Sequence, residues 1–239
     1  MYSINQISLY GLFFGMLGTI LGGFIGSYLN FNSKKYLSFI LQFAAGLMNA
    51  IICFDLIPES ILSSSLLLSI AGILLGIFLM YIINLVIINN LKNISPIFKT
   101  SLIIFIGLTL HNLPEGLAIG AGFTKDEILG FSLAISIMLH DIPEGISISS
   151  PLSSSGFSKI KSFLLASISG ITTGIGAFIG ATISNINETF IGFSLSIAAG
   201  SMLYIITYEL LPESYKLYSG KSSNLAYILG TILGMFIFI

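Results

Sequence analysis

Charged residues are scarce in this 239-residue chain. Only 8% of the residues are Asp, Glu, Lys or Arg, whereas 55% are hydrophobic, and the mean hydropathy is +1.00. A soluble domain carries charge on about a quarter of its residues, so this composition excludes a water-soluble protein and indicates an integral membrane protein. The net charge of −1 and the lack of a basic tail give no reason to expect a nucleic-acid partner.

Cysteine and histidine are also rare. The single cysteine, Cys53, cannot form an intramolecular disulfide, and its apolar neighbourhood predicts that it packs as a small hydrophobic residue. The two histidines, His111 and His140, lie in near-copies of one motif, HNLPEG and HDIPEG, inside apolar runs. Such placement of a rare ionisable residue needs a physical explanation.

Eight apolar runs account for most of the chain. Each is close to the ~20 residues that a helix needs to cross a ~30 Å hydrocarbon core. A membrane β-barrel would instead show alternating segments of about 10 residues. The sequence therefore predicts an all-α membrane protein in which residues 1–239 form a single transmembrane domain. Its eight transmembrane helices are expected at roughly 7–29, 37–60, 66–91, 101–123, 127–149, 160–184, 190–214 and 223–239.

Lysine placement predicts the orientation of the helices. Short lysine-rich loops stay in the cytoplasm during insertion. The loops after the first, third, fifth and seventh spans contain Lys34, Lys35, Lys92, Lys99, Lys159, Lys161, Lys216 and Lys221. The opposite side contains only Lys125. Both termini are therefore expected to be extracytoplasmic.

Two further segments repeat each other. Residues 44–60 read AAGLMNAIICFDLIPES and residues 198–214 read AAGSMLYIITYELLPES. In the predicted orientation the first copy runs outward and the second inward, which is typical of inverted-repeat transporters. With the two histidine motifs in the antiparallel fourth and fifth spans, the sequence predicts a 3+2+3 inverted-repeat bundle.

Ionisable residues within the apolar interiors are confined to spans two, four, five and seven. A charge at mid-bilayer costs roughly 2.5–3.5 kcal/mol even on lenient scales, so such groups should face each other, water or a ligand. We therefore expect helices 2, 4, 5 and 7 to form an inner bundle surrounded by the other four.

The histidine motifs have the geometry of a chelating site. In each motif, histidine and glutamate are four residues apart and share one helix face, giving His111 with Glu115 and His140 with Glu144. The intervening proline frees a carbonyl one turn back and kinks the helix. Because the link between the two spans is very short, the four side chains are expected to converge near the midplane.

Imidazole nitrogen together with carboxylate oxygen suits zinc and its first-row neighbours, whereas magnesium and calcium prefer oxygen alone. Asn112 and Asp141, rotated about 100° from the histidines, could serve an adjoining second site. An alternative is a kinked, proton-relaying helix pair that binds no metal.

These motifs resemble the ZIP family of divalent metal transporters, particularly its short prokaryotic ZupT/GufA-like branch. The resemblance rests on DLIPES, HNLPEG, HDIPEG and ELLPES in spans two, four, five and seven, and it covers the whole chain. It implies an eight-helix transporter of the plasma or inner membrane that imports zinc into the cytoplasm. Fe²⁺, Mn²⁺, Co²⁺ or Cd²⁺ are expected as competing substrates, with no bound cofactor. The oligomeric state is open, and a homodimer is compatible with the sequence.

The resemblance also implies roles for individual residues. The primary metal site would be formed by His111, Glu115, His140 and Glu144. Asn112 and Asp141 would be second-site ligands that share the two glutamates. Asp55 resembles an outer entrance carboxylate, and Glu209 resembles an inner release carboxylate.

Two features depart from the family pattern. Span six reads SGITTGIGA, with Thr173 where many bacterial relatives have glutamate, so the second site loses a charged ligand. This site is expected to bind weakly, or the protein works with one metal at a time. The loop at residues 90–99 has no histidine, so a metal-sensing cytoplasmic loop is not expected.

Two other functions remain as alternatives. An intramembrane zinc hydrolase could use the same ligand types, although the sequence has no HExxH motif. A proton-coupled carrier of another small solute could use the same buried ionisable groups. Carboxylates near both membrane faces favour transport over one-sided chemistry.

Overall fold

The computed structural model describes residues 2–28, 33–90, 95–183 and 188–238. Within its helices, the side chains of residues 88–90, 96, 140, 237 and 238 lie outside the description, as does Lys92, one of the residues used for the orientation. The helices are α1 (Ile4–Tyr28), α2 (Lys34–Ile51), α3 (Ile57–Ser63), α4 (Leu66–Asn90), α5 (Pro96–Lys125), α6 (Glu127–Ser154), α7 (Lys159–Ser169), α8 (Ile171–Thr182), α9 (Glu188–Tyr204), α10 (Leu211–Leu217) and α11 (Lys221–Phe238). Two π-helical turns, η1 (Ile52–Leu56) and η2 (Ile205–Leu210), continue α2 into α3 and α9 into α10.

The all-helical prediction is confirmed, and no strand occurs in the described ranges. Within these ranges, seven helical segments are long and apolar enough to cross a membrane: Ile4–Tyr28, Lys34–Ser63, Leu66–Ile87, Ile97–Lys125, Glu127–Ser154, Lys159–Thr182 and Glu188–Leu217. Helix α11 covers the last predicted span. The chain is therefore a multi-pass helical membrane protein.

Two predicted spans are not simple α-helices. The sixth is divided at Gly170 into α7 and α8, and the second and seventh contain the π turns. In both π turns the backbone N–H that closes the turn bonds five residues back, from Ile57 to Ile52 and from Leu211 to Ile206. The next residue is a proline, which has no N–H to donate, so the regular α-helical ladder is interrupted at the same place in both repeats.

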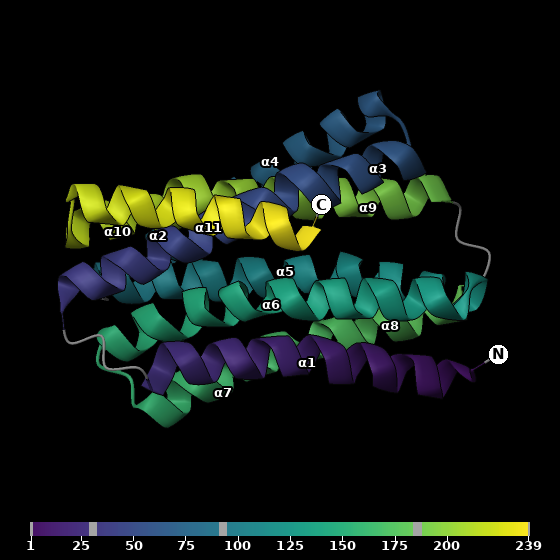
Figure 1. Cartoon of the computed structure of the whole chain (residues 1–239), viewed down its shortest axis with the longest axis horizontal. Helices are drawn as coiled ribbons and strands as arrows, with labels where there is room; N and C mark the ends of the chain where they lie inside the picture. The colour runs from purple at the N-terminus through teal and green to yellow at the C-terminus, as the bar shows by residue number, and fades with distance from the viewer. Residues whose placement is uncertain (1, 29–32, 91–94, 184–187, 239) are drawn as a thin grey trace.

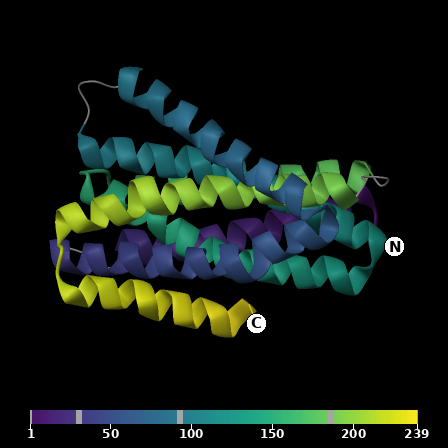
Figure 2. The same ribbon diagram turned by 90° about the horizontal axis from the view of Figure 1, so that it is seen from above.

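The helices form two layers, which Figure 1 shows one above the other. Layer A consists of α1, α5, α6, α7 and α8, and layer B consists of α2, α3, α4, α9, α10 and α11. The most extensive helix pairs lie within a layer, namely α1 with α6, α2 with α11, α5 with α8, α4 with α9 and α5 with α6. The layers meet mainly where α5 contacts α9 and α2 contacts α6. Figure 2 shows that α4 crosses the bundle obliquely.

Glycines allow the close approach of helices within each layer. A Cβ added to Gly116 of α5 would lie 2.8 Å from the Cα of Gly176 in α8, and one added to Gly145 of α6 would lie 2.7 Å from the backbone nitrogen of Gly23 in α1. In a membrane, helices associate through such backbone contact because apolar side chains gain little by leaving lipid. The glycines therefore fix the two layers as separately packed units.

A hydrogen bond and an aromatic cluster join the start of α1 to the hairpin of α5 and α6. The hydroxyl of Tyr2 donates to Glu127 Oε1 at 2.5 Å, and this bond raises the pKa of Tyr2 to about 12. The phenol is therefore a neutral donor throughout the physiological range. Its ring packs with Tyr10, Phe123 and Phe131. These contacts hold the hairpin against α1.

The glycine contacts can be tested with two neighbouring positions on α5. In Gly120→Ala, the new Cβ would meet backbone atoms of α8, including Ala181 N at 2.7 Å, whereas in Gly122→Ala it would first meet the flexible end of Leu133. Forcing two backbones apart is expected to cost about 1–3 kcal/mol, so Gly120→Ala should clearly lower the unfolding temperature in detergent, followed by circular dichroism. Gly122→Ala should change it little, because alanine also favours the helix. Equal losses would contradict the proposed backbone packing.

Candidate metal site

The two histidine motifs lie on neighbouring antiparallel helices of layer A. Helix α5 ends at Lys125 and α6 begins at Glu127. Asp126 separates them, and its side chain accepts a hydrogen bond from Leu129 N at 3.0 Å. This N-cap satisfies a free backbone N–H at the start of α6. The short link predicted from the sequence is confirmed, and it places the two motifs side by side.

The His111 imidazole contacts two carboxylates where α5 and α6 lie side by side. His111 Nε2 lies 3.0 Å from Glu115 Oε1, one turn along α5, and 3.2 Å from Glu144 Oε1 on α6. His111 is 1% exposed and both glutamates are 0% exposed. His111 therefore contacts two of the other three predicted primary ligands. The side chain of the fourth, His140, lies outside the described residues, although its backbone is part of α6.

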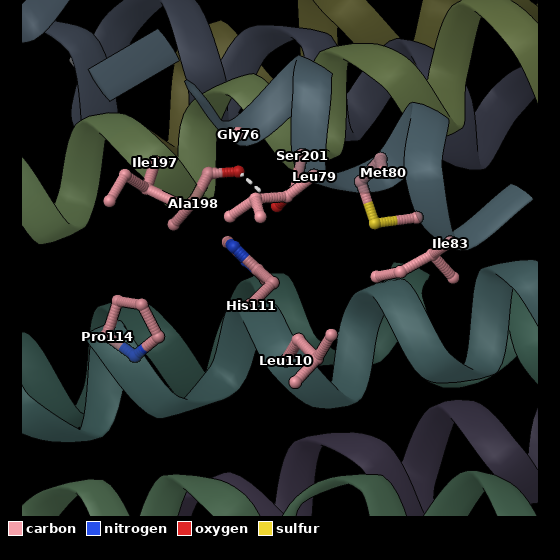
Figure 3. Close-up of a pocket in the computed structure, with 10 residues that line it drawn as sticks. All are labelled: Gly76, Leu79, Met80, Ile83, Leu110, His111, Pro114, Ile197, Ala198 and Ser201. Atoms are coloured by element: carbon pink, nitrogen blue, oxygen red, sulfur yellow. Dashed lines mark hydrogen bonds between the residues drawn. The ribbon is translucent and has the colours of Figure 1, made fainter. Parts of the chain in front are cut away.

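The imidazole of His111 also borders an apolar pocket of about 50 Å³ between α4, α5 and α9. Figure 3 shows the ring extending from α5 toward Ala198 and Ser201 of α9, with Pro114 one turn away on its own helix. The Ser201 hydroxyl already donates to the Ala198 carbonyl at 2.8 Å. The walls around the imidazole thus offer little polar solvation, which strengthens its interaction with charge.

A second group of polar side chains, Asn112, Asp141 and Thr173, lies where α5 and α6 pack against α1, α7 and α8. Asn112 and Asp141 are fully buried, and the Asn112 amide donates to the Ser169 carbonyl at 3.1 Å. Within the described residues, Asn112 Oδ1, both Asp141 carboxylate oxygens and Thr173 Oγ1 have no hydrogen-bond partner. A Cβ on Gly15 would lie 2.7 Å from Thr173 Oγ1, so the glycine surface of α1 closes over this group. The predicted second-site residues, Asn112 and Asp141, are thus fully buried, with side-chain oxygens that have no partner among the described residues.

The charge of this region is not balanced by the groups described. Three carboxylates, those of Glu115, Asp141 and Glu144, are fully buried beside one imidazole. An ionised carboxylate without compensation is costly in an apolar interior. Protons or a bound cation must therefore compensate the carboxylates. Within the described part of the chain, no three His, Cys, Asp or Glu side chains are already arranged around one metal position.

The two predicted pathway carboxylates lie in the π turns of layer B. Asp55 is half-buried in η1 and accepts a hydrogen bond from Ser136 Oγ of α6 at 3.3 Å. Glu209 is 6% exposed in η2. A π turn widens the helix and is frequent at functional sites. Both carboxylates belong to layer B, whereas His111, Glu115 and Glu144 belong to α5 and α6 of layer A.

Sequence reasoning missed the groups that hold Glu209. The Asn84 amide of α4 donates to Glu209 Oε1 at 2.9 Å and to the Tyr204 hydroxyl at 2.7 Å. An available signal was Asn84 itself, an amide within the very hydrophobic span at residues 66–91. A buried amide in such a helix needs a polar partner.

Comparisons with known proteins fit this arrangement. The family model described as "ZIP Zinc transporter" matches residues 88–239. The chain is 39% identical over 119 residues to zinc transporter GufA of Myxococcus xanthus, covering 49% of this chain and 47% of that protein. It is 38% identical over 140 residues to zinc transporter ZIP11 of Homo sapiens, covering 56% and 41%.

A longer match is to zinc transporter ZupT of Escherichia coli O7:K1, with 28% identity over 234 residues, 91% of this chain and 88% of that protein. The matches to GufA and ZIP11 span less than half of those proteins. The fold and the paired motifs define a multi-pass helical membrane protein with a buried imidazole–carboxylate site. With the family model matching more than half of its length, the chain belongs to the ZIP family.

The role of Asn84 can be tested by substitution. Asn84→Leu removes the donor to Glu209 and Tyr204, which leaves a buried carboxylate short of a partner and is expected to cost about 1–3 kcal/mol. Tyr204→Phe removes only one acceptor of the amide and should cost less. Thermal unfolding in detergent would compare the two. A larger loss for Tyr204→Phe than for Asn84→Leu would contradict the assignment of Glu209 as the main partner.

Proposed function

We propose that this protein imports divalent transition metals, with zinc as the principal substrate, into the cytoplasm through a site halfway across the membrane. The observation that carries the proposal is the buried contact of His111 with Glu115 and Glu144. A neutral imidazole and ionised carboxylates form the mixed nitrogen and oxygen ligand set that suits Zn²⁺, and also Fe²⁺, Mn²⁺, Co²⁺ and Cd²⁺.

In this proposal His111, Glu115 and Glu144 bind the metal together with His140. Asn112 and Asp141 form the adjoining second site, which shares the glutamates. The unpaired oxygens of Asn112 and Asp141 support this assignment. Metal ligands must be deprotonated to bind, so the cation and protons compete for the same buried carboxylates.

The helix packing supports the 3+2+3 inverted repeat with eight spans. If the first three spans correspond to the last three, then the α1–α6 pair corresponds to α8–α5, and α2–α11 corresponds to α9–α4. Together with the central α5–α6 hairpin, which the repeat maps onto itself, these four pairs are the most extensive among the described helices. The π turns occupy equivalent places in the second and seventh spans. Both observations are expected from two oppositely oriented copies of one unit.

Burial supports the inner position of three of the four proposed inner helices. The spans at Lys34–Ser63, Ile97–Lys125 and Glu188–Leu217 are 61%, 61% and 67% buried, whereas Leu66–Ile87 is only 22% buried. The span at Glu127–Ser154 is 47% buried, close to the 50% of Lys159–Thr182. Its inner role in the proposal rests on Glu144, which contacts His111.

The layers suggest how access could alternate. The primary ligands belong to α5 and α6 of layer A, whereas Asp55 and Glu209 belong to layer B and lie in opposite halves of the repeat. In this proposal the Glu209 side faces the cytoplasm and both termini lie outside, as the lysine-rich loops favour. The proposed location is the plasma or inner membrane. Movement of layer A relative to layer B would carry a bound cation from the side of Asp55 to the side of Glu209.

The metal site is tested by zinc uptake into proteoliposomes. His111→Ala and Glu115→Gln each remove a direct ligand, and loss of even an indirect partner typically costs 10–100-fold, so uptake should fall by at least roughly tenfold. Glu127→Gln makes the same chemical change at the surface end of α6 and should retain wild-type uptake. Unchanged flux in the double variant His111→Ala/Glu115→Ala would refute the site.

The proposed weakness of the second site is tested at Thr173. Thr173→Glu places a carboxylate beside Asp141 and Asn112, and it should raise the zinc content of purified protein from about one toward two ions per chain, measured by elemental mass spectrometry. Thr173→Gln has nearly the same shape without the charge and should leave the content unchanged. A full second zinc in the wild-type protein would contradict this account.

Parallel assays of zinc flux and of hydrolysis distinguish a transporter from an enzyme. An intramembrane zinc hydrolase would cleave peptide or lipid substrates and show no saturable zinc flux. Family membership and the separate carboxylates of the two π turns favour transport. A proton-coupled carrier of another solute would move protons without requiring zinc.

A further inference from the structure

The end of the bundle that carries the α5–α6 link contains a cavity between the two layers. It has a volume of about 340 Å³ and is lined by α3 and α9 of layer B and by α5 and α6 of layer A. Ala118 and Leu195 are apolar lining residues from opposite layers, and Glu59, Lys125 and Glu188 are its charged residues. In the proposed orientation, this cavity is an outer vestibule on the side of Asp55.

An ion pair links the layers at this vestibule. Lys125 Nζ lies 2.5 Å from Glu188 Oε1, and each side chain is 66% exposed. Lys125 is the last residue of α5 and Glu188 is the first residue of α9. A cation at a helix C-terminus and an anion at a helix N-terminus are each favoured by the helix dipole. The dipoles of α5 and α9 therefore stabilise the two charged side chains that form the ion pair.

Among the ion pairs formed between described residues, this pair differs in joining the two layers. Glu213 with Lys216, and His111 with Glu144, each lie within one layer. The hydrogen bond of Tyr2 with Glu127 also remains within layer A. The pair of Lys125 and Glu188 instead joins the two layers. Glu59 of layer B also acts electrostatically on Lys125, so two carboxylates of layer B attract one ammonium of layer A.

We propose that the Lys125–Glu188 pair is a latch that holds the outer ends of the two layers together and narrows the entrance to the vestibule. The inference rests on the proposed transport function, because it assigns the latch to the outer side of a metal pathway. An exposed ion pair contributes only modestly. Breaking it should therefore shift the population of open molecules by roughly two- to fivefold, without abolishing the fold.

A latch and a simple effect on the local potential predict different results for substitutions at Lys125 and Glu188. If the two residues only tune the local potential, Lys125→Met and Glu188→Gln should change cation entry in opposite directions. If they form a latch, both substitutions should open the vestibule. The exchanged pair, Lys125→Glu with Glu188→Lys, restores the attraction with the charges reversed. It should therefore close the vestibule again. The closure should be weaker than in the wild-type protein, because each exchanged charge lies at a helix end whose dipole disfavours it.

The test uses full-length protein in proteoliposomes, with the native thiol removed by Cys53→Ser. Ala118→Cys introduces a thiol at an apolar wall of the cavity, where the present side chain is only 5% exposed. The rate of labelling by a small, uncharged, membrane-impermeant maleimide is measured without metal. Lys125→Met and Glu188→Gln should each raise this rate roughly two- to fivefold. The exchanged pair should return it toward the starting value.

Salt provides an independent comparison, because high ionic strength screens exposed pairs. It should accelerate labelling of the chain with the intact pair but not that of Glu188→Gln. Unchanged labelling in both single variants, or changes of opposite sign, would overturn the latch. Repeating the labelling in a Glu115→Gln background separates this outcome from the transport proposal, because labelling requires no metal flux. Thermal unfolding confirms that the variants remain folded.

Discussion

The structure depends on keeping ionisable side chains inside a hydrophobic bundle. Glu115, Asp141 and Glu144 are fully buried, and His111 contacts two of them. In hydrocarbon, these groups are tolerated only if they compensate each other or bind protons or a cation. In the proposed function, a dication provides that compensation, which explains why the rare histidines and the acidic residues occur together on neighbouring helices.

The glycine contacts keep this site on one of two separately packed layers. Helices α5 and α6 carry the proposed primary ligands and pack against α8 and α1 through small residues. The proposed pathway carboxylates, Asp55 and Glu209, belong to the other layer, where proline-linked π turns interrupt the helices. In the proposed mechanism, this division lets the ligands remain together while their surroundings change. The ionic latch acts at the same boundary, at the outer end.

Much of this organisation was predictable because it follows from local sequence patterns. The apolar runs predicted the helical spans, and the four-residue spacing of His111 and Glu115 placed them on one face. The short link at Asp126 predicted the adjacency that brings Glu144 to the imidazole. Each of these depends on chain geometry over a few residues, which the sequence specifies directly.

Other features depend on contacts between distant segments. The division of span six at Gly170, the π turns and the pairing of Asn84 with Glu209 are not encoded by periodicity. The ion pair of Lys125 and Glu188 requires two helix ends to meet, although the residues are far apart in sequence. The lysine count assigned Lys125 only to a side of the membrane. Its partner became apparent only from the packing of the layers.

The central claim is that a bare dication binds between α5 and α6. Anomalous X-ray diffraction from crystals grown with zinc or cadmium tests this most directly. The account predicts a peak within metal–ligand distance, about 2.0–2.2 Å for zinc, of the His111 imidazole and the carboxylates of Glu115 and Glu144. Well-ordered crystals whose metal peaks all lie away from these three side chains would contradict it.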